Sequence, residues 1–265
     1  MQIEFSLFPG GVCRAMTMSF DDGRVQDIPL AKLFDKYGIK GTFHYNSGNL
    51  GKEGYLTEEE VREIGKNHEI SAHGYTHPFL DQLPLPMAVD EVLEDKKALE
   101  RIGNCLVRGM SYPYGTYTEE LVAVLRGIGM EYSRTINNTR SFYPPKDFMK
   151  WDPTCHQSHD LDGLWEKFLK KQKHMRLFYI WGHSYEFDRD NSWERIEAFC
   201  KRASEHGEIW FATNIEVYDY IAAMRNLKFS ADRKQVYNPS AQEVWILADG
   251  EPVKIPPAAT VRLGC

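Results

Sequence analysis

Several features that would assign this 265-residue chain to a protein class are missing from its sequence. It has no apolar run approaching the roughly 20 residues of a membrane span. It has no Gly-x-Gly-x-x-Gly stretch after a strand and no Gly-Lys-Ser/Thr phosphate loop. Its net charge is −6, whereas nucleic-acid-binding domains are normally basic. We therefore expect neither a membrane nor a nucleic acid as a partner, and the sequence leaves the oligomeric state open.

Signals for disulfides and for secretion are missing too. The five cysteines are odd in number and widely separated, with no Cys-x-x-Cys pair. This pattern favours free thiols over a disulfide framework or a cysteine zinc site. The first ten residues contain the acid Glu4 and no basic residue, unlike a secretory leader. We expect a cytoplasmic protein, or one from which a leader has been removed.

What the sequence does have is an alternation of short apolar runs and amphipathic segments. The expected strands are 15–20, 41–45, 69–73, 107–112, 130–135, 177–182 and 208–212. The expected helices are 27–37, 57–67, 87–102, 118–128, 160–173, 192–206 and 214–225. Such alternation predicts a parallel sheet covered by helices. We expect an α/β fold, a distorted (β/α) barrel of about seven parallel strands, with an open doubly wound sheet as the competing arrangement.

The pattern changes after about Arg225. The last 40 residues have no helical period and contain β-prone runs, with Asp249-Gly250 as a hairpin signal between two of them. We expect a barrel over residues 1–225 and a small β appendage of three or four strands over 226–265. An appendage of this size is too small to be stable alone, so we expect it to pack on the barrel.

The most informative stretch is Met16-Thr-Met-Ser-Phe-Asp-Asp-Gly-Arg24. It reads as a buried strand that ends in two carboxylates, Asp21 and Asp22. The carboxyl ends of parallel strands are where the chemistry of such folds usually lies. Adjacent side chains on an extended strand point to opposite sides, so the two acids need not share one role. Taken alone, Asp-Asp-Gly is equally consistent with a plain turn.

Three further motifs follow other expected strands. His73-Gly-Tyr-Thr-His77 is an i, i+4 pair, and one helical turn would place both imidazoles on one face. Tyr112-Pro-Tyr-Gly115 predicts a tight turn whose backbone N–H groups can bind an oxyanion. Trp181-Gly-His183 ends a strand on an imidazole suited to proton transfer. Each motif alone also fits an ordinary connection, but all of them lie at the same predicted edge.

Together these residues form a set suited to metal-assisted hydrolysis. Two histidines and one carboxylate can hold a divalent metal with an open position. The second carboxylate can take a proton from water, and a separate histidine can protonate a leaving group.

The four motifs, in this order, resemble those of the polysaccharide deacetylase family, also called the NodB-homology family, over about residues 15–215. The resemblance implies a distorted barrel of about seven strands and a divalent metal, zinc in many members. It also implies hydrolysis of acyl groups, usually acetyl, from an amino-sugar or oligosaccharide substrate. It leaves the β appendage without a role.

The resemblance implies a role for each matching residue. Asp21 corresponds to the catalytic base and His183 to the general acid. The metal ligands correspond to Asp22, His73 and His77. The backbone of Tyr114 corresponds to part of the oxyanion hole. Trp181 replaces the family's usual leucine, and its larger face is expected to narrow the site or to stack on a sugar ring.

The sequence departs from the family at two further places. Ser111 stands where the family commonly has an arginine that orients the base, and Arg24, Arg108 and Arg134 are the candidates to replace it. The family's acid pair ending in tryptophan is not clearly present, because Trp151 and Asp152 stand in the opposite order. The partner of His183 therefore stays open.

The segment His156-Gln-Ser-His159, followed by Asp160, has two readings. We favour a polar loop before a helix over a second metal site.

Two alternative functions remain. One keeps the site but hydrolyses another non-peptide C–N bond, as deformylases and amidohydrolases do. The other is a carbohydrate-binding relative without catalytic activity.

Overall fold

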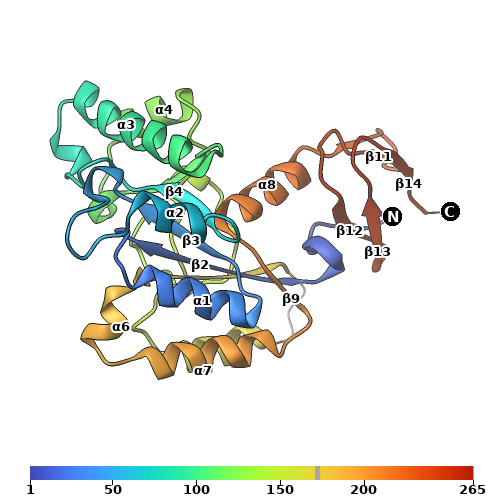
Figure 1. Ribbon diagram of the computed structural model, residues 1–265. Helices are drawn as coiled ribbons and strands as arrows, with labels where there is room; N and C mark the ends of the chain where they lie inside the picture. The colour runs from blue at the N-terminus through green and yellow to red at the C-terminus, as the bar shows by residue number, and fades with distance from the viewer. Residues whose placement is uncertain (171–173, 265) are drawn as a thin grey trace.

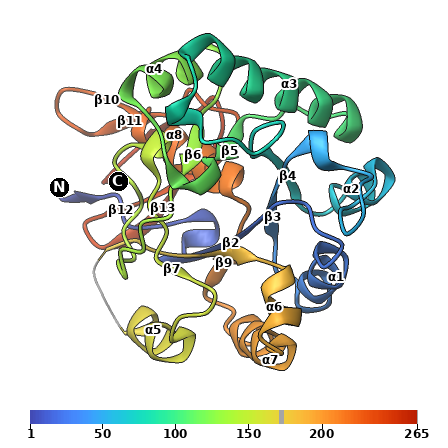
Figure 2. The ribbon, with the colours of Figure 1, turned by 90° about the vertical axis from the view of Figure 1, so that its left-hand side faces the viewer.

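The computed structural model describes residues 1–170 and 174–264, and its centre is a curled parallel sheet (Figures 1 and 2). The sheet order is β6-β5-β4-β3-β2-β8-β7, and β9 pairs with the first half of β2. These strands are β2 (Arg14–Asp21), β3 (Gly41–Tyr45), β4 (Glu69–Ala72), β5 (Gly109–Ser111), β6 (Tyr132–Arg134), β7 (Cys155–His156), β8 (Arg176–His183) and β9 (Ile209–Phe211). The predicted α/β barrel-like fold is thus confirmed.

The seven predicted strands all form, and β7 is an addition. The segment that contains β7 connects the two edges of the sheet. Trp151 bridges to Arg134 of β6, while Cys155 and His156 pair with β8. A two-residue strand has no apolar run of its own, because its pairing is decided by the neighbouring strands, so the sequence pattern did not reveal it.

Helices surround the sheet, as Figure 2 shows. They are α1 (Asp27–Tyr37), α2 (Glu58–Ile64), α3 (Leu85–Gly103), α4 (Glu119–Gly127), α5 (Leu161–Leu169), α6 (Tyr185–Arg189), α7 (Trp193–Ser204) and α8 (Asn214–Arg225). All seven predicted helices are present, although residues 171–173 of the predicted 160–173 lie outside the described residues. The Thr57–Glu60 capping box forms at the start of α2. The five-residue α6 was not predicted.

The C-terminal segment forms two small antiparallel sheets. One contains β10 (Lys228–Phe229), β11 (Gln235–Tyr237) and β14 (Thr260–Arg262), and the other contains β1 (Ile3–Glu4), β12 (Val244–Ala248) and β13 (Glu251–Ile255). The segment therefore supplies five strands, more than the expected three or four, and recruits β1 from the N-terminus. The hairpin at Asp249-Gly250 is confirmed, with both residues at positive φ.

The appendage contacts the barrel through α8. The hydroxyl of Tyr220 donates to the Leu7 carbonyl at 2.7 Å and accepts from the Trp245 N–H at 3.1 Å. Val244 and Ile246 of β12 are fully buried and belong to the same apolar cluster as residues of β8. This joint lies at the amino ends of the barrel strands, where both termini also lie (Figure 1). The carboxyl ends of the strands, at the opposite end of the barrel, are left free.

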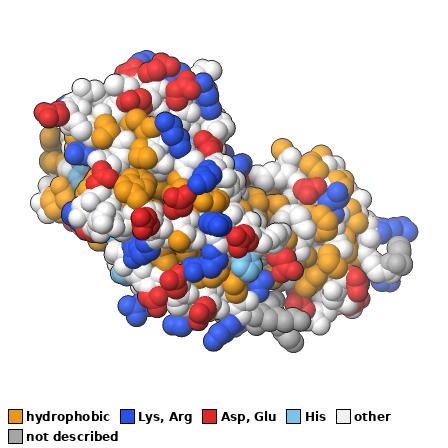
Figure 3. All heavy atoms as spheres, turned by 60° about the horizontal axis from the view of Figure 1, so that its bottom comes forward, with side chains coloured by type: hydrophobic (Ala, Val, Ile, Leu, Met, Phe, Trp, Pro, Cys, Tyr) orange, Lys and Arg blue, Asp and Glu red, His pale blue; other side chains and the backbone are white. Residues whose placement is uncertain are grey.

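The surface in Figure 3 carries interspersed acidic and basic side chains over the barrel. Some are paired across helices, such as Lys36 with Glu197 and Arg202 with Asp162. No helix among the described residues has the length and apolarity needed to cross a membrane.

Candidate metal and acid–base site

The end of β2 presents both carboxylates to one histidine. Asp21 is the last residue of the strand and is 2% exposed, while Asp22 leaves the strand at φ 83°. A straight strand would send the two side chains to opposite sides, but the kink turns Asp22 back. As a result, a carboxylate oxygen of Asp21 lies 3.7 Å and one of Asp22 3.6 Å from His73 Nε2.

The turn after Asp22 depends on its neighbours. The Asp22 N–H donates to the His44 carbonyl at 2.9 Å. Gly23 follows at φ 68°, and a Cβ there would lie 2.9 Å from the Tyr45 ring. Glycine therefore satisfies both the backbone conformation and the close approach.

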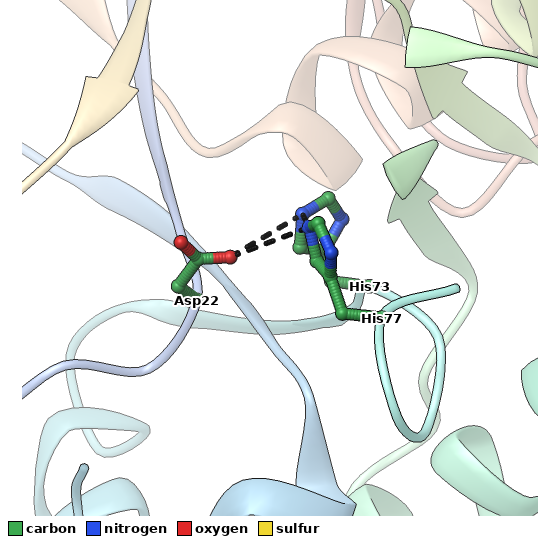
Figure 4. A group of neighbouring side chains, drawn as sticks. All are labelled: Asp22, His73 and His77. Atoms are coloured by element: carbon green, nitrogen blue, oxygen red, sulfur yellow. Dashed lines mark hydrogen bonds and ion pairs between the residues drawn. The ribbon is translucent and has the colours of Figure 1, made fainter. Parts of the chain in front are cut away.

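The two histidines of the second motif meet the same carboxylate (Figure 4). His73 and His77 place their Nε2 atoms 3.1 Å apart, and each lies 3.6 Å from Asp22 Oδ1. The expected helical turn between them is wrong. The segment is a loop in which Gly74 has φ 77° and His77 has φ 64°, and these two left-handed residues bring the rings together.

The spacing of these three side chains fits a tetrahedral metal. Zinc bonds of about 2.0–2.1 Å to nitrogen or oxygen require ligand atoms roughly 3.3–3.4 Å apart. The observed separations of 3.1–3.6 Å among Asp22, His73 and His77 are close to this value. The residues therefore fit a divalent cation without large movement.

Hydrogen bonds fix the loop that carries the histidines. Asp95 of α3 accepts from the His73 backbone N–H at 2.8 Å and from the N–H and hydroxyl of Ser47 at 2.8 and 2.6 Å. The Asn46 amide donates to the carbonyls of His73 and Gly74 at 2.6 and 2.8 Å. The loop is thus tied to both α3 and the end of β3.

The tautomer of His73 follows from its contacts. Its Nδ1 lies 2.9 Å from the Ser111 carbonyl, which can only accept, so Nδ1 carries the proton. Its Nε2 then directs a lone pair toward Asp22 and His77. Burial lowers the pKa of His73 to about 4, against the opposing effect of Asp21. A neutral, oriented imidazole of this kind is what a metal ligand requires.

Among the three candidates for the missing arginine, the structure selects Arg134. Its fully buried guanidinium forms an ion pair with Asp21, and the Ser111 hydroxyl donates to the other Asp21 oxygen at 3.2 Å. Arg24 lies over Tyr55 and Arg108 pairs with Asp219. Burial alone would raise the pKa of Asp21, but Arg134 and His73 outweigh it and hold that pKa below its ordinary value.

Trp181 has a different contact from the one expected. It is 8% exposed, the Arg134 guanidinium lies 4.3 Å from the centre of its ring, and its indole N–H donates to Asn138 at 2.9 Å. Its expected role beside the substrate stays a prediction. Trp181 supports the arginine that holds Asp21 and has little surface left for a sugar ring.

His183 finds its partner on the unpredicted helix α6. Its Nδ1 lies 3.5 Å from the carboxylate of Glu186, three residues later. Burial lowers the pKa of His183, but Glu186, Asp21 and Asp22 raise it by more, so the net shift is upward. Asp152 instead accepts from Thr135, and Trp151 is buried in the apolar core. The segment at 151–152 therefore does not serve His183.

The Tyr112-Pro-Tyr-Gly115 turn forms a 3₁₀ turn at Pro113–Gly115, with Tyr114 at φ 57°. The Gly115 N–H bonds to the Tyr112 carbonyl and the Thr116 N–H to the Pro113 carbonyl. The Tyr114 N–H is left outside these bonds of the turn. Its side chain contacts His77 with ring centres 4.5 Å apart, so the turn borders the metal-ligand group.

Sequence reasoning did not identify Glu186, and it did not single out Arg134 among the arginines. Arg134 and Glu186 contact residues that are distant in the sequence, so no local sequence pattern indicates these contacts. One signal was available for Arg134, since a charged residue inside the expected buried strand 130–135 needs a partner of opposite charge.

Part of the chain is similar to known proteins. The family described as "Polysaccharide deacetylase" matches residues 11–133. YxkH of Bacillus subtilis, a curated putative polysaccharide deacetylase, is 27% identical over 124 residues, which are 46% of this chain and 44% of that protein. The matched stretch thus spans less than half of that relative. Residues 11–133, which the family matches, contain β2, both histidines and the Tyr112–Gly115 turn.

Solved structures extend the similarity in fold. A putative polysaccharide deacetylase from Mycobacterium smegmatis has a TM-score of 0.65 at 16% identity, covering 82% of this chain and 93% of that one. A CE4 family pseudoenzyme from Bacillus anthracis has a TM-score of 0.53 at 15% identity, covering 77% and 65%. The fold therefore occurs both in putative deacetylases and in a pseudoenzyme.

Proposed function

We propose that this chain, which resembles the polysaccharide deacetylases in its sequence motifs and its fold, is a metal-dependent hydrolase that removes an acetyl group from an amino sugar or oligosaccharide. One observation carries the proposal. Asp21 and Asp22 converge on one imidazole but have different partners: Asp22 faces the two histidines, whereas Asp21 faces Arg134. These different partners suit Asp22 to bind a metal and Asp21 to accept a proton.

A divalent metal such as zinc, held by Asp22, His73 and His77, would supply Lewis-acid polarisation of the acyl carbonyl and of water. The ionised Asp21, stabilised by Arg134, accepts the proton of the attacking water. The Tyr114 N–H, which lies outside the hydrogen bonds of its own turn, donates to the oxyanion. His183, kept protonated by Glu186, donates a proton to the departing amine.

Exposed aromatic rings beside the ligand group support a carbohydrate substrate. Tyr114 and Phe79 are stacked with ring centres 3.7 Å apart, and both are partly exposed. The Tyr114 ring also contacts His77. Aromatic faces at such a position can pack against the apolar face of a sugar, which suits a substrate longer than an acyl group alone.

The proposal is tested by measuring acetate released from a panel of N-acetylated amino-sugar oligosaccharides after loading with one equivalent of zinc, cobalt or nickel. Asp21→Asn should bind metal as well as the unmodified chain but lose about 100-fold or more in kcat/KM, because a general base contributes about that much. Substantial activity of Asp21→Asn with metal bound would refute the assignment of the base.

Two other outcomes point to other functions. Release of formate, or hydrolysis only of small non-sugar amides, would favour a different C–N hydrolase. Metal binding and glycan binding without turnover on any substrate would indicate a pseudoenzyme, as in one structural neighbour.

A further inference from the structure

A second group of metal-binding side chains lies where β7, β8 and α6 meet. His156 Nε2 is 3.0 Å from one Glu186 carboxylate oxygen, and His183 Nδ1 is 3.5 Å from the other. One ligand atom from each of the three residues lies within 4.8 Å of the other two. All three side chains are at least three-quarters buried, and Nδ1 of His183 has no hydrogen bond among the described residues.

The surrounding residues hold this group in place. A Cβ on Gly182 would lie 2.5 Å from Gln157 Cγ and 3.4 Å from His156 Nε2, so only glycine lets β7 approach so closely. Arg195 donates to both the backbone and the side-chain oxygen of Gln157 at 3.0 Å. The position of His156 against β8 is therefore a packed feature of the fold.

We propose that His156, His183 and Glu186 form a second divalent-cation site, distinct from the one at Asp22, His73 and His77. Two imidazoles and one carboxylate are the ligand set of several zinc sites. Imidazole ligands favour zinc, cobalt, nickel or copper over magnesium and calcium, which prefer oxygen. The site takes a transition-metal cation and leaves a coordination position for water.

This second site binds more weakly than the first. The difference lies in the other contacts of its carboxylate. Glu186 also accepts from Gln157 at 3.0 Å and lies 3.4 Å from the Arg189 guanidinium. A cation competes with these donors for the carboxylate. The sites therefore fill in order, the Asp22 site first.

Cation binding also changes the tautomer of His156. Without a cation, the Ser158 N–H donates to Nδ1 at 3.2 Å, and Nε2–H faces Glu186. With a cation on Nε2, the proton moves to Nδ1 and is accepted by the Ser158 hydroxyl, 2.8 Å away. An acceptor behind a histidine ligand strengthens metal binding, so Ser158 supports the site.

The consequence, which rests on the proposed function, is inhibition by excess metal. A cation on Nδ1 of His183 takes the place of the contact with Glu186, so His183 cannot become the imidazolium that protonates the amine. Activity should rise as the first equivalent of zinc binds and fall as the second binds.

The test is equilibrium dialysis of the full chain against zinc, with bound metal measured per chain. We expect two zinc ions for the native protein and one for His156→Ala. His159→Ala, which removes a neighbouring histidine outside the group, should still bind two. Ser158→Ala should weaken only the second step, by about 10-fold. A single zinc ion in the native protein, or two in a folded His156→Ala variant, would overturn the proposal.

This measurement separates the two proposals because it needs no turnover. Should no substrate be hydrolysed, the proposed function fails while zinc stoichiometry still decides the second site. His77→Ala should lose the tighter zinc and keep the weaker one. In an active enzyme, the fall in activity with excess zinc should disappear in His156→Ala, and its persistence there would contradict inhibition through this site.

Discussion

Arg134 shows how one residue can replace another from a different strand. Ser111 on β5 stands where the polysaccharide deacetylases that the sequence resembles commonly have an arginine, and its hydroxyl donates to Asp21. The positive charge comes instead from the end of the adjacent strand β6, as a buried guanidinium between Asp21 and the Trp181 ring. A positive charge thus reaches Asp21 from β6, while β5 contributes only a hydroxyl.

The buried pair gives a prediction about stability. Arg134→Met should lower the free energy of unfolding by about 3–5 kcal/mol, because it leaves Asp21 charged, buried and without its partner. It should also lower kcat/KM, since the pKa of Asp21 rises. Denaturant unfolding and steady-state kinetics measure the two effects.

Two variants make this prediction specific. The double variant Asp21→Asn with Arg134→Met should be more stable than Arg134→Met alone, because no unpaired charge remains. Arg108→Met, at a partly exposed group with Asp219 and Glu131, should cost about 1 kcal/mol or less. Equal losses for Arg134→Met and Arg108→Met would contradict the importance of the buried pair.

Glu186 gives a prediction about pH dependence. If His183 is the general acid, as proposed, it must be protonated, so activity should fall as pH rises through the pKa of His183, which lies above its ordinary value. Glu186→Gln removes the charge that favours the imidazolium and lowers that pKa. The basic limb of the kcat profile should therefore move to lower pH.

The profile should be measured with one equivalent of metal, so that only the first site is filled. Glu194→Gln, an exposed change on α7, should leave the limb in place. If the basic limb of the kcat profile does not move in Glu186→Gln, a group other than His183 determines its pH.

At the scale of elements, the site depends on how loops are tied to helices. Asp95 of α3 collects three hydrogen bonds from two different loops. Asp95→Asn should therefore weaken binding of the first metal by about 10-fold, because the amide repels at least one of these donors and the loop of His73 relaxes. Calorimetric titration with zinc measures the change.

The matched control is Asp90→Asn, on an exposed position of the same helix. It should leave the zinc affinity unchanged. An unaltered affinity in Asp95→Asn would show that the loop holds its shape without α3.

The elements also show what sequence can and cannot predict. Long apolar runs and amphipathic periods located β2, β8 and α8 almost to the residue, because burial on the faces of the sheet decides both the pattern and the structure. β7 and α6 are too short to carry a period. Their residues His156 and Glu186 come together only through tertiary contacts, so the sequence suggested a polar loop at His156 and no partner for His183.

At the scale of the whole molecule, we propose that the appendage and barrel unfold together, although the sequence suggests a boundary near residue 225. The buried residues of β12 join the apolar cluster of β8 and α8. Ile246→Ala should therefore destabilise the entire chain by about 2–5 kcal/mol. We expect a single calorimetric transition that moves to lower temperature.

Leu106→Ala is the comparison, because Leu106 is 78% exposed. It should change stability by no more than about 0.5 kcal/mol. Two separate transitions in Ile246→Ala, with only one of them shifted, would show that the appendage is an independent unit.

The left-handed backbone at the site sets limits on exchanging the proposed metal ligands. Asp22 and His77 both sit at positive φ, while His73 does not. Asparagine is well tolerated at such positions and β-branched residues are not. A different ligand type should therefore cause the least backbone strain at His73, because cysteine and glutamate adopt its backbone conformation without penalty. At Asp22 and His77, a new ligand must also adopt a positive φ. The backbone conformation of these two loops therefore restricts which ligands, and so which metals, the site can be redesigned to hold.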